Sequence, residues 1–281
     1  YPAATLFTLV HVPGSVSPSI EALHPISSVL SRVPGAARLY RHFLPLYPAV
    51  VEWFDLDPFD VVISTSHCAA RSVVRTGRAR HLCYCHTPMR YVWDQRHAYF
   101  GADRIGRWQS RALAPVLAWL ARWDAATAGR ADRYVANSEH VARRIGRYYN
   151  RRAEVIHPPV DTEFFRPDGR PPGTHALVVS ALVPYKRVEV AIEACRRVGV
   201  PLRVVGQGPD QARLRRLAGP GVEFLGSLDD EGVLDAYRDA AVVLLPGEED
   251  FGIVPVEAQA CGRPVVALAC GGALETVRDG E

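Results

Sequence analysis

Hydrophobic residues along the chain form short apolar runs separated by longer amphipathic stretches. The run at 241–245 has the length and content of a buried strand, whereas residues 187–198 have the spacing of an amphipathic helix. The same pattern predicts a long helix at 104–129 and strands at 5–10, 60–64, 81–86, 133–137, 153–156, 175–180, 202–205, 222–225, 242–245 and 264–267. Regular alternation of strands and helices predicts an α/β fold with parallel sheets.

A stretch rich in proline and glycine, residues 158–173, interrupts this alternation near the middle of the chain. Such residues stop regular structure and mark boundaries. We therefore predict a first domain at 1–160, a linker at 161–173 and a second domain at 174–281. A length of 281 residues with 48% hydrophobic content is sufficient for two cores.

Two glutamates are spaced across the junction between a predicted strand and a predicted helix. Glu249 follows the strand at 242–245, and Glu257 lies in a helix predicted to start at residue 256. Open α/β sheets bind ligands at the carboxyl ends of their strands, and free backbone N–H groups at 251–253 favour a phosphate or a hydroxyl-rich ligand. The alternative is a pair of solvated surface glutamates.

Lys186 is the only lysine in a chain whose other basic residues are arginines. An ammonium group is a compact point charge that suits the crowded oxygens of a diphosphate, whereas guanidinium prefers planar, two-pronged contacts. Lys186 also lies just before the helix at 187–198, where the helix dipole favours anions. The alternative is that this lysine was retained by drift.

The charge balance limits the classes of partner. A net charge of +3 is only mildly basic, and no nucleic-acid recognition motif is present, so we expect no nucleic-acid partner. Arginines cluster near aromatic residues, which predicts either a patch for a membrane surface or a solvated helix face. The clusters are Arg104, Arg107 and Arg111 near Trp108, and Arg143, Arg144, Arg147, Arg151 and Arg152 near Tyr148 and Tyr149.

Cysteine usage and hydropathy indicate the compartment. The six cysteines form no Cys-x-x-Cys pair and lie in or beside apolar segments, which is typical of reduced thiols in the cytosol. The longest apolar helical stretch, 112–121, is too short to span a bilayer. We expect a cytoplasmic bacterial protein, with peripheral contact at the inner face of the cell membrane if the arginine patch binds lipid.

Several motifs of the chain resemble those of retaining glycosyltransferases of family 4. In the second half these are the glutamate pair with its Phe251-Gly252, the run Ala258-Gln259-Ala260-Cys261-Gly262-Arg263-Pro264, and Gly206-Gln207-Gly208-Pro209. The run Cys85-His86-Thr87-Pro88-Met89-Arg90-Tyr91-Val92-Trp93-Asp94, together with Val183-Pro184-Tyr185-Lys186-Arg187, resembles the bacterial branch with mannosyltransferases of surface-polysaccharide assembly.

The resemblance implies the GT-B architecture of two Rossmann-like domains and a nucleoside diphosphate sugar donor, with GDP-mannose favoured over UDP-sugars. It implies no metal and no cofactor. Glu257 would accept hydrogen bonds from the ribose, Glu249 would lie against the hexose, and Lys186 would stabilise the charge that grows on the diphosphate. The remaining donor-binding residues would be Arg187, Gly206, Gly208, Asp250, Phe251, Gly252 and Ile253.

His86 is the catalytic candidate in the first domain. It ends a predicted strand and precedes Thr87-Pro88, which cannot continue the sheet, so its ring is expected to meet the sugar or the acceptor. In a retaining transfer the leaving phosphate can take the acceptor proton, so this histidine need not be a base. A structural histidine that caps the strand is the alternative, and His67 is a weaker candidate of the same kind.

Two departures from the family pattern affect the expectation. Where many members carry arginine in a Gly-Arg-Leu run before the lysine, this chain has Ser180-Ala181-Leu182. The glycine-rich loop that covers the donor phosphates in the family is not visible in the first domain. We therefore expect a fragment truncated at both ends.

Parts of the sequence also fit four other functions. A dinucleotide oxidoreductase fails because the fingerprint begun by Gly206 and Gly208 has Gln211 at its third glycine position. A metal-dependent transferase would use Asp55 and Asp57, but these precede a strand instead of ending one. A thiol hydrolase based on Cys85 and His86 fails because adjacent strand residues point to opposite faces. A non-catalytic sugar-nucleotide-binding or scaffold protein stays open as an alternative. Our main expectation is an enzyme that transfers a hexose, mannose above all, to a glycan or polyprenyl-linked acceptor. This reaction would belong to cell-envelope polysaccharide synthesis.

Overall fold

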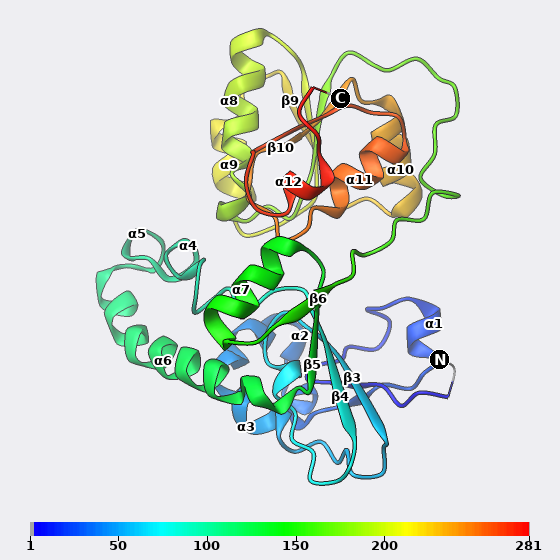
Figure 1. Cartoon of the computed structure of the whole chain (residues 1–281). Helices are drawn as coiled ribbons and strands as arrows, with labels where there is room; N and C mark the ends of the chain where they lie inside the picture. Colours follow the sequence, from blue (N-terminus) through cyan, green and yellow to red (C-terminus); the bar gives the residue numbers. More distant parts are fainter. Residues whose placement is uncertain (1–2, 281) are drawn as a thin grey trace. The chain divides into compact units, whose positions relative to one another are not determined.

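The computed structural model describes residues 3–280, except for the side chains of residues 37, 38 and 41. The chain forms two compact units (Figure 1). The first unit contains Tyr1–Ala136 and Val141–Val155, and the second contains Asn137–His140 and Ile156–Glu281. Each unit is built on its own parallel sheet.

The sheet of the first unit has four parallel strands in the order β3-β4-β5-β6. These strands are Val61–Ser66, Arg80–Cys85, Arg133–Ala136 and Ala153–Val155, within two residues of the predicted bounds. The strand predicted at 5–10 is shorter, because only β1 (Phe7–Thr8) is regular, and it pairs with β2 (Ile26–Ser27) in a separate two-stranded sheet. The pattern did not predict β2, which is too short to produce a periodic signal.

Helices and 3-10 turns connect these strands. The long helix predicted at 104–129 is confirmed as α6 (Arg107–Ala126), which starts after Gly106 at φ +87° and continues into the 3-10 turn η4 (Thr127–Arg130). The other helical segments are α1 (Pro18–Glu21), η1 (Val29–Arg32), α2 (Ala36–Leu39), η2 (Tyr40–Leu46), α3 (Tyr47–Val51), η3 (Ala70–Ser72), α4 (Arg96–Phe100), α5 (Ala102–Ile105) and α7 (Glu139–Tyr149).

A buried ion pair lies in the core of the first unit. Arg71 and Asp124 are 1% and 0% exposed, and the Arg71 guanidinium donates to the Asp124 carboxylate. The indole of Trp93 and the hydroxyl of Tyr149 donate to the other carboxylate oxygen at 2.8 and 2.9 Å. The guanidinium also lies 4.0 Å from the centroid of the Tyr149 ring. Both carboxylate oxygens of Asp124 are thus hydrogen-bonded inside the core, whereas the Nε of Arg71 has no hydrogen-bond partner within the described residues 3–280.

The sheet of the second unit has five parallel strands in the order β11-β10-β7-β8-β9. They are β7 (Ala176–Val179), β8 (Leu202–Val205), β9 (Val222–Gly226), β10 (Val242–Leu245) and β11 (Val265–Ala267), all close to the predicted strands. The chain adds β8 and β9 on one side of β7 and then crosses to add β10 and β11 on the other. The direction of winding therefore reverses between β7 and β10.

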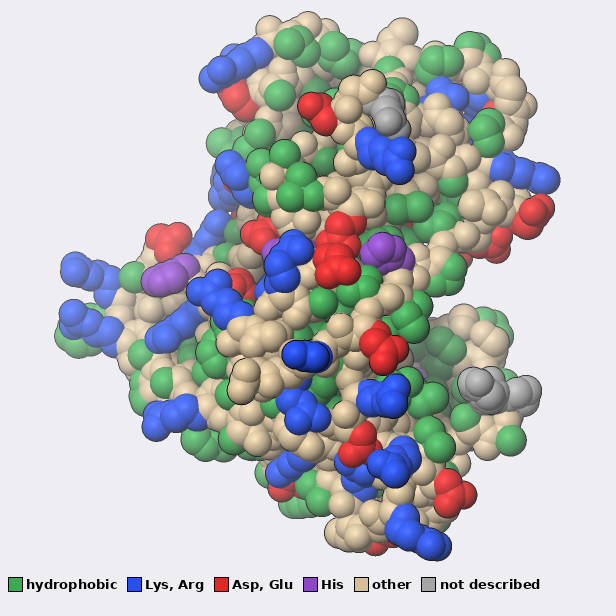
Figure 2. Space-filling view, viewed as in Figure 1, with side chains coloured by type: hydrophobic (Ala, Val, Ile, Leu, Met, Phe, Trp, Pro, Cys, Tyr) green, Lys and Arg blue, Asp and Glu red, His purple; other side chains and the backbone are tan. Residues whose placement is uncertain are grey.

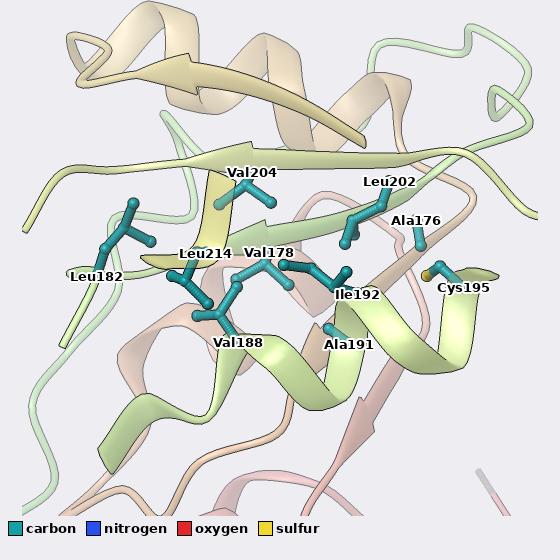
Figure 3. Packing of buried hydrophobic residues seen from close by; sticks show 10 residues of the cluster. All are labelled: Ala176, Val178, Leu182, Val188, Ala191, Ile192, Cys195, Leu202, Val204 and Leu214. Atoms are coloured by element: carbon teal, nitrogen blue, oxygen red, sulfur yellow. The ribbon is translucent and has the colours of Figure 1, made fainter. Parts of the chain in front are cut away.

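Helices cover both faces of this sheet. On one face, Val178 and Val204 of the strands pack against Val188 and Ile192 of α8 (Val188–Val198) and Leu214 of α9 (Gln211–Leu217), as Figure 3 shows. The other face packs against α10 (Asp230–Asp239) and α11 (Ile253–Ala260). The remaining helical segments are η5 (Pro184–Lys186) and α12 (Ala273–Thr276).

The segment predicted as a linker packs on the second unit. Phe164 and Phe165 lie against the core formed with α10 and α11, and the rings of Phe165 and Tyr237 have centroids 6.0 Å apart. The Arg238 side chain donates to the Arg166 carbonyl at 2.9 Å. The domain bounds at 160 and 174 stay a prediction.

Candidate functional site

The reversal of winding between β7 and β10 defines the candidate site in the second unit. Ligands of open α/β sheets bind at the carboxyl ends of the strands beside such a switch point. Lys186 comes from the segment that follows β7, and Glu249 comes from the segment that follows β10. The topology therefore brings together two of the predicted residues that are 63 positions apart in the sequence.

Lys186 and Glu249 form an ion pair. The Lys186 ammonium donates to one Glu249 carboxylate oxygen, and each side chain is 16% exposed. Both groups thus reach solvent, unlike the Arg71–Asp124 pair in the first unit. A charged pair that remains accessible at a switch point can exchange partners with a ligand, because the ammonium can donate to an arriving anion.

Backbone geometry fixes the position of Lys186. The residue ends η5, and Arg187 then adopts the left-handed conformation at φ 52° immediately before α8. Gly247 allows the other chain segment to approach, because a Cβ at this position would lie 2.7 Å from the Cα of Lys186. Gly247 was not among the predicted site residues, although a glycine directly after a buried strand and a proline indicates a close backbone approach.

A second close approach holds the backbone of the acidic loop. Glu249 forms a parallel bridge with Gly271, and the N–H of Gly272 donates to the Glu249 carbonyl at 2.8 Å. A Cβ on Gly271 would lie 2.4 Å from that carbonyl, and a Cβ on Gly272 would lie 2.5 Å from the Asp250 carbonyl. The pair Gly271-Gly272, which the sequence analysis missed, therefore determines where Glu249 lies.

Glu257 lies in a different environment from Glu249. Helix α11 starts at Ile253 and not at residue 256 as predicted, because Gly252 at φ +91° ends the loop and Pro255 is tolerated in the first turn. Glu257 is thus in the second turn, and its carboxylate accepts from the Tyr237 hydroxyl at 2.8 Å. Burial raises the pKa of Glu257, and the Tyr237 hydrogen bond opposes part of that effect.

Gly206 and Gly208 allow the loops after β7 and β8 to touch. A Cβ on Gly206 would lie 1.9 Å from the Ser180 carbonyl oxygen, and a Cβ on Gly208 would lie 2.2 Å from the Leu182 carbonyl oxygen. Gly206 also has φ +124°, a conformation that side chains disfavour. These two predicted donor-binding residues therefore have a packing role in this structure, and their contact with a donor stays a prediction.

The rest of the acidic loop is held by polar and aromatic contacts within the second unit. The Ser138 hydroxyl donates to the Asp250 carbonyl at 2.5 Å, and the ring of Phe251 stacks on His157 with centroids 5.4 Å apart. The Glu275 carboxylate accepts from His157 at 3.3 Å and, at 2.8 and 2.9 Å, from the backbone N–H groups of residues 139 and 140. Sequence reasoning missed Glu275, because no local pattern distinguishes it from a surface glutamate.

His86 lies in the first unit, directly after β4. Its backbone N–H donates to the Ser66 carbonyl at 2.8 Å, and its exposed ring makes an edge contact with Tyr84 at 5.2 Å between centroids. Cys85 beside it is fully buried, which confirms that the two side chains point to opposite faces. His67 is also exposed. A catalytic role for either histidine stays a prediction.

Neither Asp55 nor Asp57 forms a metal centre in the structure. Asp55 accepts from the N–H of Asp57 at 3.2 Å, and Asp57 accepts from the backbone and hydroxyl of Thr76. Those two hydrogen bonds hold the pKa of Asp57 below its usual value. Within the described residues 3–280, no group of three or more His, Cys, Asp or Glu side chains is arranged to hold a metal ion.

A cavity of about 520 Å³ lies in the first unit, on residues other than the predicted donor-binding and catalytic ones. Its wall includes Phe7, Ser27, Trp53, Asp55 and Phe59. Pro58 and Phe59 precede β3, so this cavity lies toward the amino ends of the strands. Parallel sheets bind ligands at the opposite edge, and for this reason we place the candidate site at Lys186 and Glu249.

The fold and the candidate site define an α/β protein with an accessible cation at a sheet edge, and comparison with known families identifies which one. The model of the family described as "Glycosyltransferase Family 4" matches residues 8–164, and that described as "Glycosyl transferases group 1" matches residues 173–281. The chain belongs to glycosyltransferase family 4.

Curated relatives agree with this assignment. A D-inositol 3-phosphate glycosyltransferase of Streptomyces bingchenggensis is 34% identical over 189 residues, covering 54% of this chain and 41% of the relative. The protein of the same name from Mycobacterium tuberculosis is 35% identical over 176 residues, covering 53% of this chain and 36% of the relative. The matched part is thus less than half the length of these relatives.

Solved structures show the fold. A sucrose-phosphate synthase from Thermosynechococcus elongatus superposes with a TM-score of 0.67 at 20% identity, covering 97% of this chain and 72% of that chain. Anabaena HepE in complex with UDP superposes with a TM-score of 0.61 at 18% identity, covering 93% of this chain and 72% of that chain. The chain has the GT-B fold, with two Rossmann-like α/β parts.

Proposed function

We propose that this chain carries the donor site of a retaining glycosyltransferase. The observation that carries the proposal is the accessible Lys186–Glu249 pair at the switch point between β7 and β10. In the proposed reaction the bond between the sugar C1 and the diphosphate breaks, and a new bond forms from C1 to an acceptor hydroxyl on the same face. The acceptor proton goes to the leaving phosphate, so no protein base is required.

Lys186 stabilises the charge that develops on the leaving diphosphate. At about 4 Å and an effective dielectric near 20, the attraction is about 4 kcal/mol before desolvation is subtracted. Such a contact accounts for about two orders of magnitude or more in rate. The ammonium is held by Glu249 in the structure, so the incoming diphosphate competes with that carboxylate. Arg187, exposed beside Lys186, supplies a second cation.

The two glutamates have different roles in this proposal. Glu249 orients the hydroxyls of the hexose after Lys186 turns to the phosphate. Glu257, which Tyr237 holds through one oxygen, accepts from the ribose hydroxyls of the donor. The backbone N–H groups at Gly252 and Ile253 and the loops at Gly206 and Gly208 complete the donor pocket, with Asp250 and Phe251 between them. His86 contacts the acceptor or the transferred sugar.

The hexose proposed is mannose, and the acceptor proposed is a glycan or polyprenyl-linked sugar of the cell envelope. The motif at 85–94 supports mannose and a guanine nucleotide. The names of the relatives and neighbours support other choices, since HepE was solved with UDP and with UDP-glucose and the curated relatives are named for inositol 3-phosphate. Uridine donors are therefore tested beside GDP-mannose in the titration, and inositol 3-phosphate is one of the acceptors for the assay of product formation.

Calorimetry tests the donor site directly. The chain is titrated with GDP-mannose, UDP-glucose, GDP and UDP, in parallel with Lys186→Met and a control variant, Arg216→Met, which removes an exposed cation of α9 in the same unit. We expect binding of the nucleotides with one nucleobase, guanine or uracil, and not of the other. Lys186→Met is expected to weaken that binding by roughly tenfold or more, because a hydrogen bond to a charged group is lost. Equal affinities in Lys186→Met and the parent contradict the assignment.

A non-catalytic sugar-nucleotide-binding protein is the second candidate, because Ser180-Ala181-Leu182 lacks the arginine that many family members use to bind phosphate. Both candidates bind the donor through Lys186 and Glu257. Product formation separates them. The enzyme releases nucleoside diphosphate in the presence of an acceptor, with Lys186→Met lowering turnover and Glu257→Ala mainly weakening donor binding. The binding protein releases none.

A further inference from the structure

Helix α6 presents large aromatic side chains to solvent. Trp108 is 83% exposed and Trp119 is 46% exposed. The two residues are 11 positions apart, which is about three helical turns, so they lie along one line of the helix. Tryptophan contributes a large apolar area when it is buried, and its exposure on a helix face therefore indicates a binding surface more than random placement does.

The same face is positively charged. Arg107, Arg111 and Arg122 are exposed on α6, and Arg104 lies just before it. Residues 104–123 contain no aspartate or glutamate. Asp103 lies 3.8 Å from Arg104, and Asp124 is fully buried against Arg71, so neither acid neutralises the middle of this face. We call the exposed set Arg107, Trp108, Arg111, Trp119 and Arg122 the α6 face.

On two other arginine-rich helices of the chain, part of the arginine charge is paired with acids on or beside the helix. On α8, Arg196 and Arg197 both pair with Glu193. On α9, Arg213 pairs with Asp210 and Glu189, whereas Arg215 and Arg216 are exposed. Within the described residues 3–280, no such partner is present for Arg107 or Arg111. The charge of the α6 face is therefore available to an external anion.

The second arginine cluster of the sequence, on α7, is a different case. Arg144 pairs with Asp94 and donates to the Thr87 hydroxyl at 2.7 Å. Tyr149 is 5% exposed and binds Asp124, and the ring of Tyr148 stacks on Trp93 at 4.6 Å between centroids. These residues serve the interior of the first unit. Arg143 and Arg147 of α7 are exposed, but α7 contains no tryptophan, so α6 is the stronger candidate for a membrane surface.

The inner side of α6 is fixed to the core. Leu117 and Leu120 are buried, and Leu113 and Val116 pack against the same cluster. The helix thus has an apolar side turned inward and an aromatic and cationic side turned outward. In the described part of the chain, no helix combines the length and apolar content that crossing a bilayer requires. An outward face of this composition is typical of helices that lie in the plane of a membrane surface.

We propose that the α6 face docks on an anionic lipid bilayer. Charge complementarity selects this occupant, because the arginines attract acidic lipid headgroups while Trp108 and Trp119 insert at the interface. Basic and acidic side chains are intermixed over the surface in Figure 2, so a local cluster, and not the net charge of +3, is what binds. This docking goes beyond the proposed donor chemistry and does not depend on it.

Vesicle flotation tests the docking on the full chain without any sugar ligand. The vesicles contain either phosphatidylcholine alone or phosphatidylcholine mixed with phosphatidylglycerol. We expect binding only to the anionic vesicles, with a decrease as salt rises. Arg107→Gln with Arg111→Gln is expected to weaken partitioning roughly 25-fold, since each basic residue near an anionic surface contributes roughly fivefold. Trp108→Ala is expected to weaken it roughly tenfold.

Matched variants control for charge and for aromatic content. Arg196→Gln with Arg197→Gln removes the same two charges from exposed sites on α8, and Trp53→Ala removes a tryptophan that is 68% exposed. Circular dichroism checks that each variant folds. Absence of binding to the anionic vesicles, or equal losses in test and control variants, overturns the proposal. So does a change in the oligomeric state of the α6 variants without lipid, since the face would then be a protein interface.

Discussion

The two units place an acid and a base together in opposite ways. In the first unit, Arg71 and Asp124 pair at 1% and 0% exposure, and Trp93 and Tyr149 both donate to the second carboxylate oxygen of Asp124. In the second unit, Lys186 and Glu249 pair at 16% exposure each, at the edge where two strands end. The first pair is sealed from ligands, and the second is open to them.

This difference separates structural charge from candidate functional charge. A sealed pair has lost the hydration of both ions and depends on its internal partners, so removal of one member leaves an uncompensated charge. An accessible pair keeps part of its hydration and can change partners at small cost. Exposure, and not the presence of an ion pair, thus identifies Lys186 as the residue to test for binding.

The largest expected effect comes from the sealed pair. Asp124→Asn is expected to destabilise the first unit by about 3–5 kcal/mol, because the Arg71 charge remains buried without its counter-ion. The matched change at the open pair, Glu249→Gln, is expected to cost about 1 kcal/mol or less. Urea denaturation measures both. Tryptophan fluorescence reports the first unit, which contains Trp53, Trp93, Trp108, Trp119 and Trp123, and far-UV circular dichroism follows the second. Equal losses in the two variants break the comparison.

Next in size is a backbone clash in the second unit. In Gly208→Ala the new Cβ would lie 2.2 Å from the Leu182 carbonyl oxygen and 2.6 Å from its carbon, so the two loops must separate. We expect a loss of about 2–3 kcal/mol, of the size that overpacking usually costs.

Gly219→Ala is the control for this change, because no atom lies within 4 Å of its Cβ position. It is expected to change stability by about 0.5 kcal/mol or less. Far-UV circular dichroism in urea follows both variants. A tryptophan transition that shifts as far as the circular dichroism transition in Gly208→Ala would contradict a local effect on the second unit.

A smaller effect is expected from a buried histidine of the first unit. His81 is 1% exposed, its Nδ1–H donates to the Arg130 carbonyl at 3.1 Å, and its Nε2 accepts from the Ser64 hydroxyl at 2.8 Å. Burial lowers the pKa of His81, and these hydrogen bonds fit the neutral ring that this shift favours. The unfolded chain then binds the proton first, so stability is complete above about pH 6.5 and falls as the pH drops below it.

Thermal melts between pH 5 and 8 by tryptophan fluorescence test this dependence. We expect the midpoint to fall on the acid side, and we expect His81→Asn to be less stable at pH 8 by about 1–2 kcal/mol but to show a shallower acid limb. An acid limb of the same slope in the parent and the variant would assign the pH dependence to other groups.

The smallest expected effect has the opposite sign. Burial raises the pKa of Glu257, so the folded chain holds this proton to higher pH than the unfolded chain does. Stability from this group is present at low pH and is lost as the pH rises through the raised value. Glu257→Gln removes the cost of an ionised buried carboxylate and is expected to raise the midpoint at pH 7 by about 1–3 °C, with no gain near pH 4. A lower midpoint at pH 7 would show that the Tyr237 bond outweighs desolvation.

The sequence by itself determined the elements and the class of fold. Hydrophobic periodicity located the strands of both main sheets within about two residues, because short runs of apolar and β-branched residues favour strands in either sheet. Lys186 was noticed because no other lysine exists in the chain, and Glu249 and Glu257 because of their spacing across a junction. These are local signals that one chain segment carries alone.

Only the tertiary structure decided how those residues meet. Glu249 pairs with Lys186, which is 63 positions away, whereas Glu257 accepts a hydrogen bond from Tyr237. No local sequence pattern predicts which partner each glutamate has. The close backbone approaches at Gly247 and Gly271 likewise depend on segments that come together only when the sheets form. The same is true of the buried ion pair between Arg71 and Asp124. Local patterns set which element a residue belongs to, whereas long-range packing sets its partners, its exposure and therefore its chemistry.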